Sequence, residues 1–300
     1  MPPVRATGRS RRSAAFGTAS EGGRARRVSA IALARADACD AAGGGRRVGK
    51  VDESAPTLFV IPAFNEIDNL PRLLSDLEGR PTLFGEGSRV ILVDDGSTDG
   101  TAEFAERYSG QVPLEVIRLG TNQGPGAAFR AGFAAALASS DREALVVTLE
   151  ADTTSDLDVL PAMLECARKD AELVLASVHG GGRMLNVGFV RRTLSRGAGA
   201  VVRLALGVDA RTVSSFFRVY RVSLLRLAHS HFGEGLIRER GFACKAELLA
   251  KLQELGAVVH EVPVDLDASR RVGESKMRVG ETLAGYWRLV ARSRFMRDPA

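Results

Sequence analysis

Two adjacent carboxylates, Asp94 and Asp95, stand at the end of an apolar run and are the first candidates for chemistry in this chain. The run before them, Val90–Val93, is typical of a strand that is buried on both faces. In an open α/β sheet, ligands bind in the crevice outside the carboxyl ends of the strands. Because two neighbouring acids are costly to keep unpaired, the pair indicates a hydrogen-bonded ligand or a nearby metal ion. The alternative is ordinary turn chemistry, in which Asp95 caps a helix that begins near Ser97 or Thr98 and Asp94 is solvated.

Three further acids follow other apolar runs in the same way. Glu66 comes after the run Leu58–Ile61, and Glu150 and Asp152 come after Ala144–Leu149. Acids gathered at one rim of a sheet repel one another unless a cation or a donor-rich ligand lies among them. Side chains two apart in an extended turn point the same way, so Glu150 and Asp152 are candidate ligands for one Mg²⁺ or Mn²⁺ ion. Such ions take oxygen ligands and commonly bridge to substrate phosphates.

Strand-like and helix-like segments alternate in the order that a parallel sheet requires. Strands are predicted at 58–61, 90–93, 114–117, 144–149 and 172–176, with helical periodicity between them. This pattern favours an α/β fold with a mostly parallel central sheet flanked by helices and right-handed crossovers. After residue 180 the alternation breaks down, and the later segments are a basic amphipathic helix at 187–206, a strand at 213–220, a helix at 241–255 and a strand at 257–264.

The positive charge of the chain resides in its first fifty residues. The net charge is +5, but residues 1–50 hold eleven Arg/Lys and three Asp/Glu, a balance of +8, so residues 51–300 carry −3. This distribution argues against nucleic-acid binding by the body of the protein. Residues 1–55 are rich in Arg, Ala, Gly and Ser without periodicity, and we expect a disordered basic leader there.

Cysteine spacing and hydropathy indicate the setting. Cys39, Cys166 and Cys244 lack C-x-x-C or His/Cys ligand spacing, so we expect inert, reduced thiols and a cytoplasmic location. No apolar run approaches the ~20 residues of a membrane span, which leaves peripheral contact with the inner face of a membrane as the form that any membrane interaction would take. An amphipathic helix is expected over 281–300; its Tyr286 and Trp287 fit a helix packed on the body or one at a membrane interface.

Four motifs occur in the order and spacing of a known enzyme family. I-P-A-F-N-E at 61–66, V-D-D-G-S-T-D-G-T at 93–101, N-Q-G-P-G-A-A-F-R-A-G at 122–132 and E-A-D at 150–152 together resemble family 2 glycosyltransferases with the GT-A fold. Two later motifs, V-S-S-F-F-R-V-Y-R at 213–221 and R-R-V-G-E-S-K at 270–276, resemble the polyprenol-phosphate branch, which includes enzymes like dolichol-phosphate mannose synthase. The resemblance implies a glycosyltransferase domain over residues 56–280.

The resemblance also implies roles for the motif residues. The implied nucleotide-binding residues are Pro62, Ala63, Glu66, Asp94, Asp95, Gly124, Gly126 and Ala127. The implied ligands of Mg²⁺ or Mn²⁺ are Glu150 and Asp152. The implied contacts to the diphosphate or to an acceptor phosphate are Arg218, Arg270, Gly273, Ser275 and Lys276. An arginine fork suits phosphate recognition because its donors match the phosphate oxygens in pairs.

The implied reaction is an inverting transfer of a hexose from a GDP- or UDP-linked donor, with a polyprenyl phosphate as the leading acceptor. The metal at Asp152 and the guanidinium of Arg218 would neutralise the departing diphosphate. A phosphate acceptor is already anionic, whereas a hydroxyl acceptor on a cell-envelope glycan or a small molecule would need a general base. Asp156, Asp158 and Glu247 are the candidates for that base.

Four departures from the family pattern keep other functions open. Glu150 replaces the usual aspartate, Pro125 stands where a lysine or leucine is common, and Phe216 replaces a glycine. The loop that usually reads S-R-Y before its glycines is Ser177-Val178-His179 here, so an acceptor-binding arginine is missing. A nucleotide-binding module with a decayed active site would fit such changes. A sugar-phosphate nucleotidyltransferase fits less well, because that class needs a glycine- and Arg/Lys-rich loop after the first strand and this chain has P-A-F-N-E there.

Overall fold

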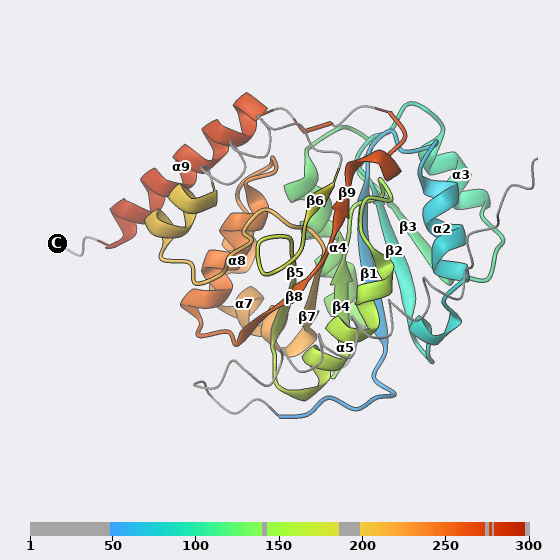
Figure 1. Ribbon diagram of the computed structural model, residues 1–300. Coiled ribbons are helices and arrows are strands. Elements are labelled where there is room, and N and C mark those ends of the chain that lie inside the picture. The colour runs from blue at the N-terminus through green and yellow to red at the C-terminus, as the bar shows by residue number, and fades with distance from the viewer. Residues whose placement is uncertain (1–48, 140–142, 186–198, 274–275, 278, 298–300) are drawn as a thin grey trace, which may run out of the picture.

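The centre of the molecule is a seven-stranded sheet (Figure 1). The computed structural model describes residues 49–139, 143–185, 199–273, 276–277 and 279–297. The strands lie in the order β3-β2-β1-β4-β7-β5-β8. Their bounds are β1 Thr57–Ala63, β2 Arg89–Asp94, β3 Leu114–Arg118, β4 Leu145–Thr148, β5 Leu173–Ser177, β7 Arg218–Arg221 and β8 Val259–Pro263. Only the pairs that β7 makes with β4 and β5 are antiparallel, so the mostly parallel sheet expected from the sequence is confirmed.

Helices cover both faces of the sheet (Figure 1). One layer holds α2 Leu70–Glu78, α3 Thr101–Arg107 and α5 Leu160–Lys169. The other holds α4 Pro125–Ser139, α7 Val222–Phe232, α8 Cys244–Glu254, α9 Val279–Arg297 and a helix over residues 199–206. Alternate strand residues enter opposite layers, as when Leu58 joins the core under α4 and Phe59 joins the core under α2. Burial on both faces explains why the strands read as continuous apolar runs.

Close packing of α4 on the sheet explains its small residues. A Cβ atom at Gly132 would lie 2.3 Å from Cγ1 of Val60, so only glycine fits between the helix and β1. The small residues let α4 lie directly on the strands whose carboxyl ends carry the acids. The helix therefore brings its amino end, which begins at Pro125, to that rim of the sheet.

Several boundaries differ from the sequence expectation for local reasons. Pro62 and Ala63 continue β1 instead of forming its loop, because both pair in register with β2. α3 begins at Thr101, and not near Ser97 or Thr98, because Gly100 has a left-handed φ of 94° and ends the turn before the helix.

The strand expected at 213–220 is shorter and runs the other way. Only Arg218–Arg221 is extended, and Thr148 pairs with Arg218 in an antiparallel register. Residues 213–217 form a loop whose carbonyls accept hydrogen bonds from Arg218. The antiparallel direction places the amino end of β7, and this loop, at the same rim as the carboxyl ends of β1, β2 and β4.

The remaining sequence expectations concern the leader, the basic helix, the cysteines and membrane spans. Residues 1–48 of the expected leader, and residues 187–198 of the expected basic helix, lie outside the described residues. Residues 49–55 contact the body, where the amide of Val51 donates to the carbonyl of Arg168 at 2.8 Å. Cys244 is a buried free thiol, as expected, whereas Cys166 is disulfide-bonded, contrary to the expectation of reduced thiols. Within the described part of the chain, every helix is too short or too polar to cross a bilayer.

Candidate active site

The acids singled out in the sequence lie at one rim of the sheet. β2, β1 and β4 are consecutive strands, and Asp94, Glu66 and Asp152 lie at or just after their carboxyl ends. All three side chains are buried, as is Asp95. The convergence expected from the sequence is therefore what the structure shows, although the contacts of the individual acids differ from expectation.

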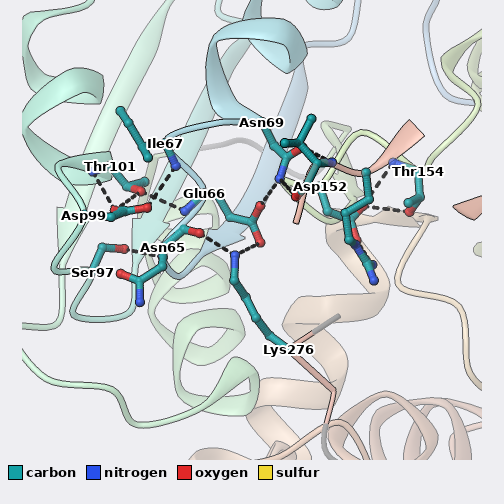
Figure 2. A network of polar contacts seen from close by, with 12 residues as sticks. Asn65, Glu66, Ile67, Asn69, Ser97, Asp99, Thr101, Asp152, Thr154 and Lys276 are labelled. Atoms are coloured by element: carbon teal, nitrogen blue, oxygen red, sulfur yellow. Dashed lines mark hydrogen bonds and ion pairs between the residues drawn. The ribbon is translucent and has the colours of Figure 1, made fainter. Parts of the chain in front are cut away.

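The loops after β1 and β2 are tied together by the polar residues of the second motif (Figure 2). The amide of Asn65 donates to Ser97 Oγ at 2.9 Å, and the amide of Glu66 donates to Thr101 Oγ1 at 2.8 Å. Asn65 in turn accepts from the amide of Thr98 at 2.8 Å. The residues of S-T-D-G-T that resemble ordinary turn chemistry thus have a second task, which is to hold the loop that carries Glu66.

Asp95 organises the glycine-bearing loop. Its two oxygens accept hydrogen bonds from the amides of Gln123 and Gly124, both at 2.8 Å. Burial raises the pKa of Asp95; the two amide hydrogen bonds oppose this, and the charge of Asp94 adds to it. The alternative of a helix-capping Asp95 and a solvated Asp94 is wrong, because both are buried and Asp95 bonds to a different loop. Among the described residues, the only hydrogen bonds that Asp94 accepts are long ones, at 3.2 and 3.3 Å, both from the amide of Ser97.

Glu66 is joined to a segment two hundred residues away in sequence. Its Oε1 pairs with Lys276 Nζ at 2.6 Å, and its Oε2 accepts from Asn69 Nδ2 at 2.7 Å. Asn69 also holds both the amide and the carbonyl of Val272, at 2.9 and 3.0 Å. Figure 2 shows Lys276 reaching Glu66 from the side opposite Asn69. The segment after β9 Leu266–Asp267 therefore crosses the rim above β1.

Asp152 is the second point at which this segment meets the rim. One oxygen of Asp152 accepts from the amide and the hydroxyl of Thr154, at 3.0 and 2.7 Å, and the other pairs with Arg271. Thr153 has a φ of 61°, which is costly for a β-branched residue, and its hydroxyl donates to the carbonyl of Arg270 at 2.9 Å. Among the described residues the only other non-glycine residue with positive φ is Asn65, at the same rim. Backbone strain of this kind collects at functional sites.

Glu150, two residues before Asp152, borders a cavity. It makes no hydrogen bond or ion pair with the residues that the structure describes, and it lines a small cavity of about 70 Å³ with Asp156, Ser214 and Ser215. Two carboxylates, one of them already held against a cation, form the oxygen donor set that Mg²⁺ and Mn²⁺ prefer. The residues present at Glu150 and Asp152 therefore fit a divalent metal ion.

A larger cavity, of about 380 Å³, adjoins the first through Ser214, which lines both. Its walls include Arg203, Arg211 and His179, so its electrostatic character is cationic. No sequence motif marks Arg203 or Arg211 as site residues. His179, from the loop that lacks the acceptor-binding arginine of the family, also lines this cavity.

The structure contradicts the expected phosphate contact at Arg218. Its side chain is fully buried, and its guanidinium donates to the carbonyls of Ser215, Lys245 and Val213 at 2.8 to 3.0 Å. Because its three guanidinium nitrogens each donate to a backbone carbonyl, Arg218 shapes the 213–217 loop and does not contact a ligand. The loop that lines the first cavity is therefore the feature that depends on Arg218.

Glu247 is likewise unsuited to act as a general base. One oxygen accepts from the amides of Arg238 and Glu239, both at 2.8 Å, and the other pairs with Lys251 at 2.5 Å. Lying buried in α8 with both oxygens engaged, Glu247 organises the 238–239 turn.

The glycines of the third motif approach protein backbone and not open space. A Cβ atom at Gly124 would lie 2.5 Å from the carbonyl oxygen of Arg240, and one at Gly126 would lie 2.0 Å from that of Glu239. The amide of Gly126 donates to Arg240 at 2.8 Å, and Ala127 is buried behind it. The need for glycine at these positions is explained by packing against residues 239–240, where a nucleotide had been expected.

The residues of the last motif, at 270–276, differ in their contacts with the rim. Arg270 contributes its carbonyl, which bonds Thr153 and Arg72, and Gly273 has a left-handed φ of 83°. Ser275 lies outside the described residues. The cation that reaches Asp152 is Arg271, and not the expected Arg270. Two adjacent arginines give no signal of which one faces the rim.

A second group of possible ligands lies at the opposite rim. Ligand atoms of Cys166, Asp170 and His260 all lie within 4.8 Å of one another, at the amino ends of β5 and β8. Because Cys166 is disulfide-bonded, its sulfur is not available as a thiolate ligand. This group does not correspond to the metal site expected at Glu150 and Asp152.

Comparison with solved structures concerns the fold. The structure is similar, with a TM-score of 0.55 and 20% identity, to glucosyl-3-phosphoglycerate synthase from Mycobacterium tuberculosis, solved in complex with Mn²⁺, uridine-diphosphate and glucosyl-3-phosphoglycerate. The match covers 81% of this chain and 80% of that one. The GT-A fold expected from the sequence is confirmed.

Comparison of sequences identifies the family. The chain is 31% identical over 242 residues to undecaprenyl-phosphate mannosyltransferase of Micrococcus luteus, a match that covers 78% of this chain and 95% of the relative. It is 29% identical over 238 residues to polyprenol monophosphomannose synthase of Mycolicibacterium smegmatis, covering 78% and 86%. The model of the family described as glycosyl transferase family 2 matches residues 58–227. With its acids gathered at the rim that the motifs predict, the chain belongs to glycosyl transferase family 2.

Proposed function

We propose that this glycosyltransferase is a metal-dependent, inverting enzyme that moves a hexose from a GDP- or UDP-linked sugar to a polyprenyl phosphate. The observation that carries the proposal is the pairing of two of the rim acids with cations of one segment, Glu66 with Lys276 and Asp152 with Arg271. Sites that hold cations in the free protein suit a metal and a polyanionic diphosphate in the complex. The names of the relatives, which refer to undecaprenyl and polyprenol phosphates, support the acceptor class.

Donor binding rests on Glu66 and Asp94, with Asp95 in a supporting role. Glu66 offers buried acceptor oxygens, and Asp94 keeps a buried carboxylate with only long bonds to the described chain, so both suit hydroxyl and N–H donors of a nucleoside. Asp95 positions the 123–124 loop beside them. Asp94 at the end of β2 and Glu66 in the loop after β1 would give the nucleoside site two acidic walls.

Departure of the nucleoside diphosphate is assisted at Glu150 and Asp152. A divalent ion held by these carboxylates would supply Lewis-acid stabilisation of the leaving charge. When a diphosphate enters, Arg271 and Lys276 exchange their carboxylate partners for phosphate oxygens, which needs only small movements of long side chains. The segment that carries these cations thus changes partners from protein to substrate.

The acceptor phosphate would lie in the cationic cavity of Arg203, Arg211 and His179, which adjoins the cavity of Glu150. A phosphate monoester is a nucleophile at neutral pH without deprotonation, so no general base is needed. A single in-line displacement from this side inverts the anomeric carbon. Of the three candidate bases for a hydroxyl acceptor, Glu247 is engaged elsewhere, whereas Asp156 lines the cavity of Glu150.

The test is turnover with and without a lipid phosphate. Purified protein with Mn²⁺ is incubated with a panel of nucleotide sugars, and released nucleoside diphosphate is measured with and without polyprenyl phosphate. Asp152→Asn is expected to lower turnover by about 100-fold or more, as for loss of a group that stabilises the transition state. Lys169→Ala, which removes an exposed ion pair to Glu165 in α5, is the control. Release that does not depend on the lipid phosphate, or full activity of Asp152→Asn, would overturn the proposal.

A further inference from the structure

The C-terminal helix α9 carries an exposed apolar stripe that borders the face packed on the body. Val279, Leu283 and Trp287 recur at every fourth position, so they lie on one face of the helix, and each is exposed. Trp287 is 70% exposed, which is unusual for the largest apolar side chain. Isolated exposed apolar residues need no explanation, but a stripe along one helix face marks an interaction site.

The adjoining face holds α9 firmly to the protein. Tyr286, Leu289 and Val290 belong to the buried core that also contains α8. A Cβ atom at Gly285 would lie 2.8 Å from that of Ala243, so the helix approaches the body closely. Burial raises the pKa of Tyr286 to about 12. The exposed stripe is therefore presented by a docked helix, and not by a loose tail.

Two arginines add to this attachment. Arg288 and Arg292 each contact one oxygen of the buried Glu239 at 3.0 Å. Their side chains remain about half exposed, so their charge is still felt at the surface. By sequence, α9 contains four arginines and one glutamate, whereas residues 51–300 as a whole carry −3. A basic helix thus lies on an acidic body.

The helix over residues 199–206 extends the apolar surface. Its buried residues Val202 and Leu206 pack in the same core as Tyr286 and Leu289 of α9, and Figure 1 shows it next to α9. Its outward residues Val201 and Leu204 are 57% and 87% exposed, and they are one helical turn apart. Arg203 lies between them in sequence.

We propose that this surface, the α9 face, defined by Val201, Leu204, Leu283 and Trp287, docks onto an anionic lipid bilayer with α9 parallel to the membrane plane. Apolar residues with tryptophan among them, flanked by arginines, are what an interfacial helix needs to enter the boundary between head groups and acyl chains. The charge of α9 is complementary to anionic head groups, and the acidic remainder of the body would be repelled from them.

The α9 face lies near the active site, so membrane contact would serve the reaction. This role rests on the proposed function. The stripe begins at Val279, three residues after Lys276, and Lys276 contacts Glu66 at the rim. Arg203 lies on the 199–206 helix and lines the cationic cavity. A bilayer against the α9 face would therefore bring lipid head groups toward the cavity that we assign to the acceptor phosphate.

The test uses Trp287 as a local reporter, since it is the only tryptophan of the chain. The full-length protein, without nucleotide or acceptor, is titrated with vesicles of phosphatidylcholine alone or mixed with phosphatidylglycerol. We expect a saturable blue shift of the tryptophan emission with the anionic vesicles, weakened by salt, and quenching by bromine-labelled acyl chains. Binding of the basic residues 1–50 alone would not change the environment of Trp287.

Variants show which residues carry the contact. Leu204→Ser and Leu283→Ser should each weaken vesicle affinity about tenfold, since burial of one leucine is worth ~1.5 kcal/mol or more. Leu227→Ser in α7 is the matched control, because Leu227 is 43% exposed but lies outside the α9 face. The variant Asp152→Asn should bind vesicles normally even though it loses turnover, which separates this inference from the proposed function.

Three outcomes would overturn the inference. The first is an unchanged Trp287 emission with anionic vesicles. The second is a blue shift that depends on protein concentration without lipid, which would show that a second copy of the chain covers the α9 face. The third is an equal effect of Leu227→Ser and Leu204→Ser, which would show that the apolar contact is not confined to this surface.

Discussion

Two cations of the chain itself occupy the acids that ligands would use. Lys276 pairs with Glu66 and Arg271 pairs with Asp152, so the free protein avoids unpaired buried carboxylates. A buried acid without a partner would be costly, and a pair with one long flexible cation is easily exchanged. On the proposed function, binding of metal and nucleotide would therefore exchange the partners of these two acids.

This exchange predicts the effect of removing Arg271. In Arg271→Ala, Asp152 loses its cation, and a divalent ion no longer has to displace it, so we expect Mn²⁺ to bind the nucleotide-free protein several-fold more tightly. Calorimetric titration with Mn²⁺ measures this directly. Turnover should fall in the same variant, because the diphosphate loses a contact. Weaker Mn²⁺ binding by Arg271→Ala than by the wild type would show that Arg271 does not compete with a metal.

The raised pKa of Asp95 has a consequence for stability. A carboxyl group whose native pKa is raised contributes stability that is fully present below its unfolded value, near 3.8, and is lost as pH rises through the native pKa. Asp95→Asn removes this titration and keeps the shape. We expect the free energy of unfolding of the wild type, relative to Asp95→Asn, to fall as pH rises from about 4 and then to level off. Urea unfolding from about pH 4 to pH 7 measures the difference.

A difference that grew with pH would mean that the two amide bonds to Gln123 and Gly124 outweigh burial. Distant carboxylates titrate in the same range, but their contributions cancel between the wild type and Asp95→Asn; only the neighbouring Asp94 is coupled to the substituted site.

Sequence patterns indicated which acids gather at the rim but not what each one touches. Glu66, Asp94, Glu150 and Asp152 could be predicted because each follows an apolar run, and parallel strands bring such positions together. The burial of Arg218 could not, since it depends on the antiparallel direction of β7 and on carbonyls of residues 213 and 245. A motif gives a residue type in order along the chain, and the partner of a side chain is set by packing far from it in sequence.

At the scale of elements, α4 and the 239–240 turn are fitted to each other. Gly126 donates its amide to Arg240, and it leaves no room for a Cβ atom against Glu239. The turn is held from its other side by Glu247 and by the arginines of α9. One glycine contact thus connects the glycine-bearing loop of the site to the C-terminal helix.

A matched pair of glycine substitutions tests this fit. Gly126→Ala places a Cβ atom 2.0 Å from the carbonyl oxygen of Glu239, so we expect a loss of about 2 kcal/mol or more in the free energy of unfolding. Gly280→Ala, also at the second position of a helix, meets nothing within 4 Å and should be neutral or stabilising by up to about 1 kcal/mol. Urea unfolding of both variants measures these effects. Equal stabilities would show that the turn moves aside without cost.

For the molecule as a whole, periodicity predicted the parallel half of the fold well. The strands at 58–61, 90–93 and 114–117 lie within β1, β2 and β3, because burial on both faces imposes a continuous apolar pattern. The elements in the second half of the chain were harder to predict from periodicity. α7 was not foreseen, and the 213–217 loop has the composition of a strand but is held irregular by Arg218 and Ser215.

Cys244 offers a reporter of the whole fold. It lies in the core shared by α4, α7, α8 and α9, and burial raises the pKa of its thiol to about 12. At about pH 8 only ~10⁻⁴ of such a thiol is the reactive thiolate, so alkylation requires opening of the core. We expect the alkylation rate of Cys244, followed by mass spectrometry of its peptide, to rise with urea with the same dependence as global unfolding. A free thiol compound in the same urea corrects for the intrinsic rate. α8 contacts α4 and α7, and its core continues into α9. An alkylation rate independent of urea would therefore show that α8 opens by itself. The helical layer behind the active site would then not be one cooperative unit.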